Sequence, residues 1–463
     1  MIERFRDHLE KTGLIPPGTR VLVGYSGGAD STCLLRMLHE LGVDVVAGHL
    51  HHGQRIEADQ EQKMCEAFCQ ELGIPIASGR ADVPRMSKDL KIGLEEAGRE
   101  ARYGFFRQAA FQTGCSLIAT AHTLSDKVET VLLNIARGTG LSGLAGIPER
   151  RENIVRPLMI FTREETRAYC SELGLWFHDD PANEDLGFSR ARVRLRIVPE
   201  FRSINPAAES VIARLATHAS EEDRFLDSMA AAALERCEEP PNGDLAFLTR
   251  NVEVVLNRNL ISALPPVLFK RAMRLIAGVL GASLTTEQVE TLLNGVATEE
   301  KGSVTPEGGE VAMEWDTEIL HARILAPPVP FRSALEVPGE TVSDEFGWIL
   351  TAQELASPQA KPERVTLATE LDLAKIKGPL HFRTAKSGDS MQPFGFKGTR
   401  KLSDLLSEAK LTRAARARMP IICDMVGCLW APGVCLDQRA ATDSQSERVV
   451  ALRFGALDGP SKP

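Results

Sequence analysis

The sequence predicts an α/β protein: an N-terminal doubly wound parallel sheet of Rossmann-like type, followed by two smaller α/β or α+β domains. First, the chain has 463 residues, more than a single hydrophobic core usually serves. Second, short apolar runs alternate with helical patterns as far as residue 200, where the alternation stops. Third, 43% of the residues are hydrophobic and 25% are charged, which is typical of a folded chain.

The first βαβ unit is predicted between residues 21 and 50. Residues 21–23 and 43–50 are apolar and β-branched runs, and residues 32–41 carry apolar side chains at helical spacing. Helical patterns then alternate with strand-like runs, with helices at 57–72 and 94–113 and strands at 74–76 and 116–121. This alternation indicates parallel strands with right-handed crossovers. Ligands bind such sheets beyond the carboxyl ends of the strands.

The pattern changes after Arg202. Residues 206–234 are alanine-rich with helical spacing, and apolar runs at 252–264 and 271–280 continue a mixed helical region. Prolines 327, 328, 330 and 338 mark a boundary, beyond which short β-like runs occur at 348–350, 419–426 and 449–454. We therefore expect three domains: 1–205, the catalytic domain; 206–330, mainly helical; and 331–463, of α+β type.

The charge is unevenly distributed. A net charge of −9 argues, taken whole, against a protein dominated by phosphate-backbone binding. However, residues 380–420 carry +6 and residues 186–202 carry +4, which leaves −19 for the rest. These two segments are therefore candidates for contact with a nucleic acid.

No apolar stretch is long enough to span a bilayer, and the first residues lack the apolar centre of a signal peptide. We expect a cytoplasmic protein with no membrane partner. The nine cysteines include no C-x-x-C pair and no Cys/His cluster of zinc-binding spacing, which favours buried free thiols.

A phosphate-binding loop is predicted directly after the first strand. Two adjacent glycines let backbone N–H groups converge on an anion, and the following helix adds its positive N-terminal end. An aspartate there would repel phosphate unless a cation lay between them, so we expect Asp30 to act with Mg²⁺ on the phosphates of ATP. The alternative is an ordinary Gly-Gly turn with a helix cap. The loop consists of Ser26, Gly27, Gly28, Ala29, Asp30 and Ser31.

This hexapeptide resembles the SGGxDS signature of the PP-loop, or N-type ATP pyrophosphatase, superfamily. The resemblance implies cleavage of ATP to AMP and pyrophosphate through adenylation of a carbonyl-type oxygen. Sulfur-transferring relatives carry catalytic cysteines, often as C-x-x-C pairs, and glutamine-dependent relatives need a second site with a nucleophilic cysteine. Neither pattern occurs here. A free amine is the best remaining nucleophile.

Further motifs lie at residues 49–55, 93–103, 119–130, 137–140, 156–158 and 180–196. Together they resemble bacterial tRNA(Ile)-lysidine synthases, strongly over the first 200 residues and loosely near the C-terminus. The resemblance implies adenylation of the wobble cytidine of a CAU-anticodon tRNA(Ile), followed by displacement of AMP by the side-chain amine of free L-lysine. It also implies ATP as a cofactor, beside the Mg²⁺ expected from Asp30, and a homodimer is possible.

Two carboxylates and two arginines are the predicted catalytic side chains. Asp126 and Glu129 are three residues apart at a predicted helix start, so they share a face. Both match positions that the family uses for lysine, where they would hold its ammonium or accept a proton; a solvated helix face is the alternative. Arg190 and Arg194 share another face, and one of them would stabilise the adenylated intermediate. The family usually has Asn where Ala191 stands.

The remaining predicted contacts are histidines at strand ends, two arginines of the N-terminal domain and basic residues near the C-terminus. The histidines are expected to contact substrate rather than a metal, and ion pairing explains Arg99 about as well. The resemblance of the C-terminal region to the family implies that this region binds tRNA, through the acceptor arm. A tRNA-thiolating enzyme and a non-catalytic RNA-binding protein remain the alternatives. The substrate contacts are His51, His52, Arg99, His122 and Arg137; the tRNA contacts are Arg383, Lys397, Arg400, Lys401, Arg413, Arg416 and Arg418.

Overall fold

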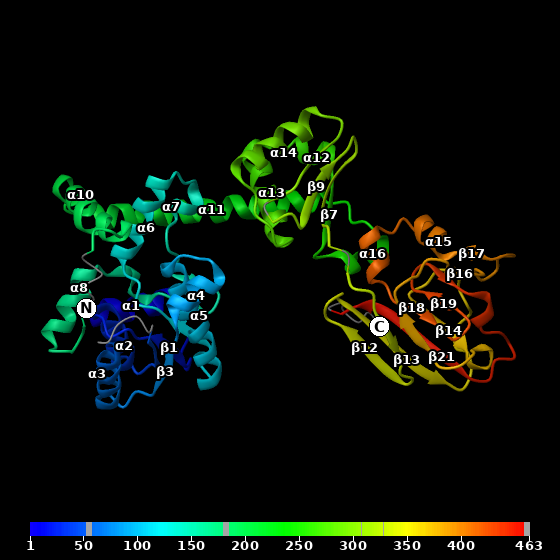
Figure 1. Ribbon diagram of the computed structural model, residues 1–463, viewed down its shortest axis with the longest axis horizontal. Coiled ribbons are helices and arrows are strands. Elements are labelled where there is room, and N and C mark those ends of the chain that lie inside the picture. The colour runs from blue at the N-terminus through cyan, green and yellow to red at the C-terminus, as the bar shows by residue number, and fades with distance from the viewer. Residues whose placement is uncertain (52–57, 179–184, 307, 327, 458–463) are drawn as a thin grey trace. The chain divides into compact units, whose positions relative to one another are not determined.

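The computed structural model describes residues 1–51, 58–178, 185–306, 308–326 and 328–457. The chain forms two compact units, Met1–Phe225 and Leu226–Pro463. Figure 1 labels their helices and strands. Within the described ranges, no helix combines the length and the apolar character needed to cross a bilayer. The mixed α/β class predicted from the sequence is confirmed.

The first unit is built on a six-stranded sheet with the order β3-β2-β1-β4-β6-β5. All neighbouring strands are parallel except the edge pair β5–β6, so the predicted parallel sheet is present. The strand order reverses between β1 and β4. At such a switch point the loops that follow the two strands diverge and leave a crevice. The strands are β1 (Val21–Gly24), β2 (Val45–His51), β3 (Ile76–Arg80), β4 (Leu117–Ala119), β5 (Arg150–Arg151) and β6 (Ile154–Val155).

Helices cover both faces of this sheet because its central strand is apolar on both sides. Val21 and Val23 of β1 pack into one hydrophobic cluster with α1, α2, α3 and α8, whereas Leu22 packs into another with α5. Successive side chains of a strand point to opposite faces, which explains the division. The helices are α1 (Ile2–Thr12), α2 (Ala29–Glu40), α3 (Ala58–Glu71), α4 (Val83–Leu90), α5 (Leu94–Thr113), α6 (Leu124–Arg137), α7 (Leu141–Leu144), α8 (Arg163–Glu172), α9 (Ser189–Arg192) and α10 (Val198–Ile204).

The boundary between the two units falls within α11 (Ala208–Cys237), the helix predicted from residue 206 onward. A four-stranded antiparallel sheet, β7-β10-β9-β8, follows it and packs with the three helices of the same segment and with the end of α11. The prediction of a helical region across 252–264 is wrong for its first part. Residues 253–257 form β7, because Val255 and Leu256 are buried there and the segment pairs with β10. The elements are β7 (Glu253–Asn257), α12 (Arg258–Ser262), α13 (Pro266–Val279), α14 (Thr286–Thr298), β8 (Gly302–Val304), β9 (Val311–Trp315) and β10 (Ile319–Ile324).

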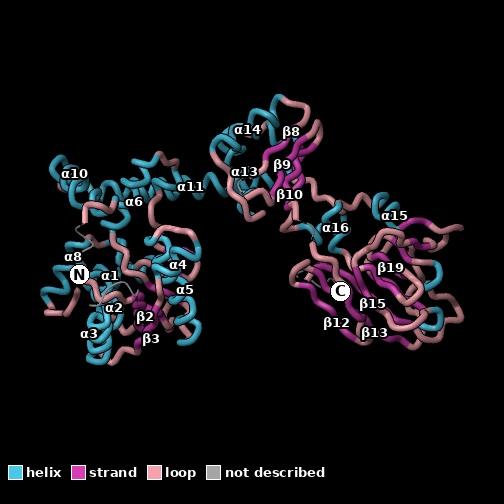
Figure 2. Tube along the Cα trace, viewed as in Figure 1, coloured by secondary structure: helices cyan, strands magenta, loops and turns pink. Residues whose placement is uncertain are grey.

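The C-terminal segment is rich in strands, which Figure 2 shows in magenta. Its sheets have the orders β12-β13-β21-β14 and β11-β15-β18-β19-β20, with β16 and β17 as a separate pair. Strands were predicted at 348–350 and 449–454, and both are present; of residues 419–426, only 421–423 are a strand. The elements are β11 (Arg332–Ala334), β12 (Gly339–Ser343), β13 (Trp348–Leu355), β14 (Ala368–Asp372), β15 (His381–Arg383), β16 (Ser390–Met391), β17 (Arg400–Lys401), α15 (Leu402–Glu408), α16 (Arg413–Arg418), β18 (Ile421–Cys423), β19 (Cys428–Ala431), β20 (Cys435–Leu436) and β21 (Val449–Ala456).

A buried carboxylate connects distant parts of the second unit. Glu253 of β7 is 4% exposed and accepts hydrogen bonds from Asn242 Nδ2 at 3.3 Å, Thr412 Oγ1 at 2.6 Å and His321 Nε2 at 3.2 Å. Thr412 is also the N-cap of α16 and accepts from the Ala415 amide at 3.2 Å. Burial alone raises the pKa of Glu253, but these three partners outweigh it and hold the pKa below its usual value.

Candidate active site

The loop after β1 is closed by hydrogen bonds among its own residues. Ser31 Oγ donates to the Gly28 carbonyl at 2.9 Å and accepts from the Ser26 amide at 3.2 Å. The two serine hydroxyls lie 3.2 Å apart, and Ala29 begins α2. The hydroxyls and the N-terminus of α2 thus lie together at the end of β1, an arrangement suited to an anion.

Gly27 has no room for a side chain. Its φ is +79°, which L side chains rarely adopt, and a Cβ there would lie 2.9 Å from Cys65 Sγ and 3.3 Å from the ring of Trp176. The Gly27 carbonyl accepts a hydrogen bond of 2.8 Å from the His178 amide. The first glycine of the pair is therefore required by both conformation and space.

Three carboxylates from two helices meet around one guanidinium. Asp30 lies in the first turn of α2, and Asp126 and Glu129 lie in the first two turns of α6. Arg163 Nε is 3.5 Å from Asp30 Oδ2, its Nη2 is 2.8 Å from Asp126 Oδ1, and its Nη1 is 3.0 Å from Glu129 Oε1. The sheet thus brings the predicted phosphate-loop aspartate and the predicted lysine carboxylates into one cluster.

Arg194 completes the cluster from the other side. Its Nε donates to Glu129 Oε1 at 2.7 Å and its Nη2 to Glu129 Oε2 at 3.1 Å, a two-point contact. Arg194 lies in a π-helical turn, residues Val193–Ile197, that follows α9. Arg190, one turn earlier, contacts Thr130 Oγ1 of α6 at 3.3 Å instead. Among the described residues, Arg194 is hydrogen-bonded to one of the predicted catalytic carboxylates, Glu129, whereas the hydrogen bond of Arg190 goes to a threonine hydroxyl.

Sequence reasoning missed Arg163, although the sequence carries a signal for it. Arg163 is the first residue of α8, which Thr162 and Glu165 cap with reciprocal hydrogen bonds. A cation at a helix N-terminus opposes the helix dipole, which disfavours it by about 0.3–1 kcal/mol. An arginine placed directly after a capping threonine therefore indicates an acidic partner elsewhere in the fold.

The pKa values of Asp30 and Asp126 are shifted in opposite directions by their surroundings. Burial and the charge of Asp126 raise the pKa of Asp30 to about 6, against a partly compensating hydrogen bond from Thr166. Burial also raises the pKa of Asp126, but the charge of Arg163 and the hydrogen bonds from Thr123 outweigh it and bring the pKa below its usual value. Asp126 is therefore ionised at neutral pH and is a weak proton acceptor. Its chemistry is that of a cation-binding group.

His122, after β4, lies near Asp126 and near three arginines. Burial lowers its pKa to about 4; the charge of Asp126 acts against this shift, and the charges of Arg156, Arg190 and Arg102 act with it. The imidazole is therefore neutral at pH 7, with its Nδ1 3.0 Å from Thr120 Oγ1. A neutral ring beside several arginines is suited to contact an anionic or polar substrate.

The other predicted substrate contacts are more scattered. His51 is buried at the end of β2. Arg99 is exposed on α5 and stacks over Tyr103, with 5.1 Å from its guanidinium carbon to the ring centroid. Arg137 is exposed in the last turn of α6, eight residues and roughly 12 Å along the helix axis from Glu129. His52 lies outside the described residues.

The predicted tRNA contacts differ in how they are held. Arg383 is buried and forms a two-point ion pair with Asp389 at 2.7 and 2.8 Å, so it does not present its charge to solvent. Lys397, Lys401 and Arg413 are exposed. The last three are half-buried: Arg400 pairs with Glu408, Arg416 donates to the Leu411 carbonyl, and Arg418 stacks over Phe346.

The aromatic residues among these charges are mostly core residues. Phe382 and Trp430 are buried, whereas Phe396 is 45% exposed. All nine cysteines are buried and unbridged. Among the described residues, no group of three or more His, Cys, Asp or Glu side chains is placed to hold a metal by itself.

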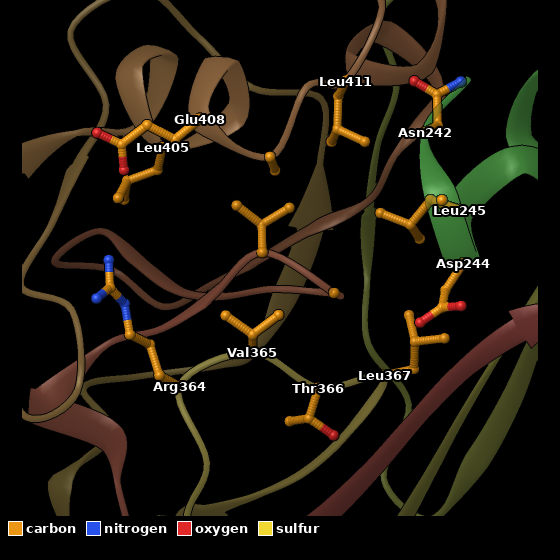
Figure 3. A pocket seen from close by; sticks show the side chains of 14 residues that line it. Asn242, Asp244, Leu245, Arg364, Val365, Thr366, Leu367, Leu405, Glu408 and Leu411 are labelled. Atoms are coloured by element: carbon orange, nitrogen blue, oxygen red, sulfur yellow. The ribbon is translucent and has the colours of Figure 1, made fainter.

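A pocket of about 390 Å³ lies in the second unit, between residues 242–245, the segment 364–367 and α15 (Figure 3). Arg364, Glu408 and Asp244 stand around leucine and valine side chains that line it. All of its lining residues fall between 242 and 434, whereas the predicted catalytic residues fall between 30 and 194. None of the predicted catalytic residues is therefore among the residues that line it.

Family models match segments in both the N-terminal and the C-terminal half of the chain. Residues 2–201 match the PP-loop domain family, and residues 380–452 match the TilS substrate C-terminal domain family. The chain is 30% identical to the tRNA(Ile)-lysidine synthase of Dehalococcoides mccartyi over 99% of this chain and 100% of that protein. It is 32% identical to that of Symbiobacterium thermophilum over 98% of this chain and 97% of that protein. A crystal structure of a TilS C-terminal domain aligns with 28% of this chain and 100% of the domain, at 28% identity and a TM-score of 0.27.

Proposed function

Because the chain belongs to the tRNA(Ile)-lysidine synthase family, we propose that it is an ATP-dependent carbon–nitrogen ligase that joins free L-lysine to the wobble cytidine of a CAU-anticodon tRNA(Ile). The observation that carries this proposal is the cluster itself. The carboxylates proposed to bind lysine share a guanidinium with the aspartate of the phosphate loop. The two substrates would therefore meet where the reaction needs them.

The reaction has two steps. The C2 oxygen of cytidine attacks the α-phosphorus of ATP, and pyrophosphate leaves. The side-chain amine of lysine then attacks C2, and AMP leaves with the original oxygen. Ser26, Ser31 and the start of α2 would cradle the pyrophosphate, and one of Arg190 and Arg194 would offset the charge of the adenylated intermediate. Asp126 and Glu129 would hold the ammonium of lysine.

Mg²⁺ would be held by Asp30 together with phosphate oxygens of ATP. Magnesium sites commonly use one or two carboxylates plus substrate phosphates, which fits a site with a single carboxylate at the loop. The ion would offset charge on the pyrophosphate as it leaves. Burial and the charge of Asp126 raise the pKa of Asp30 to about 6; Arg163 at 3.5 Å acts against this, and a bound cation would favour the ionised form in the same way.

The exposed basic residues of the C-terminal segment, Lys397, Lys401 and Arg413, would contact the tRNA backbone. We propose a cytoplasmic location because the substrates are there. We also propose the three domains expected from the sequence, which place a division near residue 330 inside the second unit. A homodimer is proposed as well.

The test is incorporation of radiolabelled L-lysine into a CAU-anticodon tRNA(Ile) transcript in the presence of ATP. Stable label and one AMP released per lysine are expected. Label removed by mild alkali would indicate an aminoacyl ester and refute the proposal. Absence of both label and ATP cleavage would favour a non-catalytic RNA-binding protein. An Asp30→Ala variant should release no AMP but should retain its affinity for tRNA.

A further inference from the structure

The carboxylates proposed to bind lysine already accept hydrogen bonds on all four oxygens. Asp126 Oδ2 accepts from the amide and hydroxyl of Thr123, both at 2.9 Å, and its Oδ1 accepts from Arg163 at 2.8 Å. Glu129 Oε1 accepts from Arg163 and Arg194, and its Oε2 accepts from Arg194. An ammonium that arrives here competes with a cation already in place.

Arg163 is the partner that can move away. Thr123 is fixed by the capping box of α6, and Arg194 grips Glu129 at two points. Arg163 makes one contact to each of three carboxylates, the longest being the 3.5 Å contact to Asp30, and its side chain is 27% exposed. Its guanidinium also lies beside the phosphate loop, where the charge of ATP would arrive.

The charges of the cluster also favour Arg163 as the residue that moves. Three carboxylates face two guanidinium groups, so the cluster carries −1 when Asp30 is ionised. A guanidinium binds phosphate in the same two-point fork by which it binds a carboxylate. If phosphate oxygens took over Arg163, Asp126 and Glu129 would keep a single cation, Arg194, and would have two acceptor positions vacated.

We infer that Arg163 is a positioning residue that couples ATP binding to lysine binding. In the nucleotide-free protein it occupies the acceptor positions of Asp126 and Glu129. ATP phosphates draw it toward the loop, and the ammonium of lysine takes the vacated oxygens. The inference rests on the proposed function, since it takes L-lysine as the amine substrate.

The coupling between nucleotide and lysine is expected to be positive, and its size can be estimated. Couplings between ligand sites are typically about 5- to 150-fold in affinity, and they are reciprocal. L-lysine should therefore bind roughly tenfold or more tightly when nucleotide is present, and lysine should tighten nucleotide binding by the same factor. Without Arg163 the carboxylates are open at all times, so lysine should bind the nucleotide-free variant at least as tightly as it binds the nucleotide-bound wild type.

The experiment is calorimetric titration of L-lysine into the full chain, with and without α,β-methylene ATP, which is not cleaved at the α-phosphorus. Wild type, Arg163→Gln and Arg163→Lys are compared. Arg4→Gln is the matched control, because Arg4 also contacts α8, through a 2.7 Å ion pair to Glu165, but lies outside the cluster. The ratio of the two lysine affinities should be tenfold or more in wild type and Arg4→Gln, smaller in Arg163→Lys and near one in Arg163→Gln.

A purely structural role for Arg163 would weaken lysine binding in Arg163→Gln and leave the ratio unchanged, which would overturn the inference. Equal lysine affinity with and without the analogue in wild type would overturn it as well, while leaving the proposed function intact. No lysine binding to wild type under either condition would overturn the proposed function and this inference with it. If Arg163→Gln does not fold, the ratio in Arg163→Lys decides: an unchanged ratio refutes the coupling.

Discussion

Replacing Gly27 with alanine tests the geometry of the phosphate loop. The substitution places a side chain at φ +79°, where an L residue loses about 1–2 kcal/mol. It also places a Cβ 2.9 Å from Cys65 Sγ and 3.3 Å from Trp176, an overlap typical of overpacked cores, which lose about 1–3 kcal/mol. The expected loss of unfolding free energy is the sum, about 2–5 kcal/mol.

Thermal unfolding measures this loss. For a unit of this size, each kcal/mol lowers the melting temperature by about 2–4 °C, so Gly27→Ala should melt roughly 4–20 °C below wild type. The two contributions separate in a double-mutant cycle with Cys65→Ala, which removes the closest contact. The smaller side chain should relieve most of the overlap but none of the backbone strain.

Two results would refute this reasoning. A Gly27→Ala protein that melts with wild type would show that the loop tolerates the side chain. A cost that stays the same in the Cys65→Ala background would show that the close contact with the sulfur is not its source. ATP affinity, measured on the same proteins, should fall in both Gly27→Ala proteins because the backbone of the loop is displaced.

The remaining predictions concern titration, lysine recognition and tRNA contact. Burial and a neighbouring carboxylate raise the pKa of Asp30 from 3.8 to about 6, so the folded protein keeps a proton that the unfolded chain loses between those pH values. Wild type should therefore lose up to roughly 3 kcal/mol of stability from pH 4 to 6 relative to Asp30→Asn, and parallel stability–pH curves would contradict this. Glu129→Gln should raise the KM for lysine roughly 10- to 150-fold, since a hydrogen bond to a charged group contributes about 1.5–3 kcal/mol; Glu164→Gln, which alters an exposed ion pair, is the control and should leave the KM unchanged. Arg413→Gln should reduce the slope of log affinity for tRNA against log salt by roughly 0.7–0.9, whereas Arg383→Gln should leave that slope unchanged and instead destabilise the fold by about 3–5 kcal/mol. The opposite pattern in these two variants would show that the buried arginine, not the exposed one, faces the RNA.

The sheet and the helices that line the site were predictable because their signals are local. The apolar run at 21–23, the glycine pair and the helical spacing of 94–113 each lie within a short window, and the structure has the corresponding elements there. The reversal of strand order explains why residues far apart in sequence meet at one edge. The segment 253–257 was predicted wrongly because its burial depends on pairing with β10, which lies more than 60 residues later.

The partners of the clustered carboxylates could not be predicted from short stretches of sequence. Asp126 and Glu129 could be singled out from their spacing, but their shared partner is 34 to 37 residues away, on another helix. Likewise, Arg383 looked like part of a basic surface because its neighbours in sequence are basic. Its burial against Asp389 depends on the packing of β15, which the charge pattern does not record.

The three donors around Glu253 have a consequence for biosynthesis. The chain is made from the N-terminus, so β7 leaves the ribosome about 160 residues before Thr412, one of its carboxylate's partners. Until then a carboxylate destined for the interior lacks a donor that stabilises its charge, and a fragment that ends before α16 never acquires it. Truncated or stalled products are therefore incomplete in the middle of the chain as well as at their end. Thr412, the residue that caps the helix carrying Arg413, Arg416 and Arg418, supplies a hydrogen-bond donor to a strand made long before it.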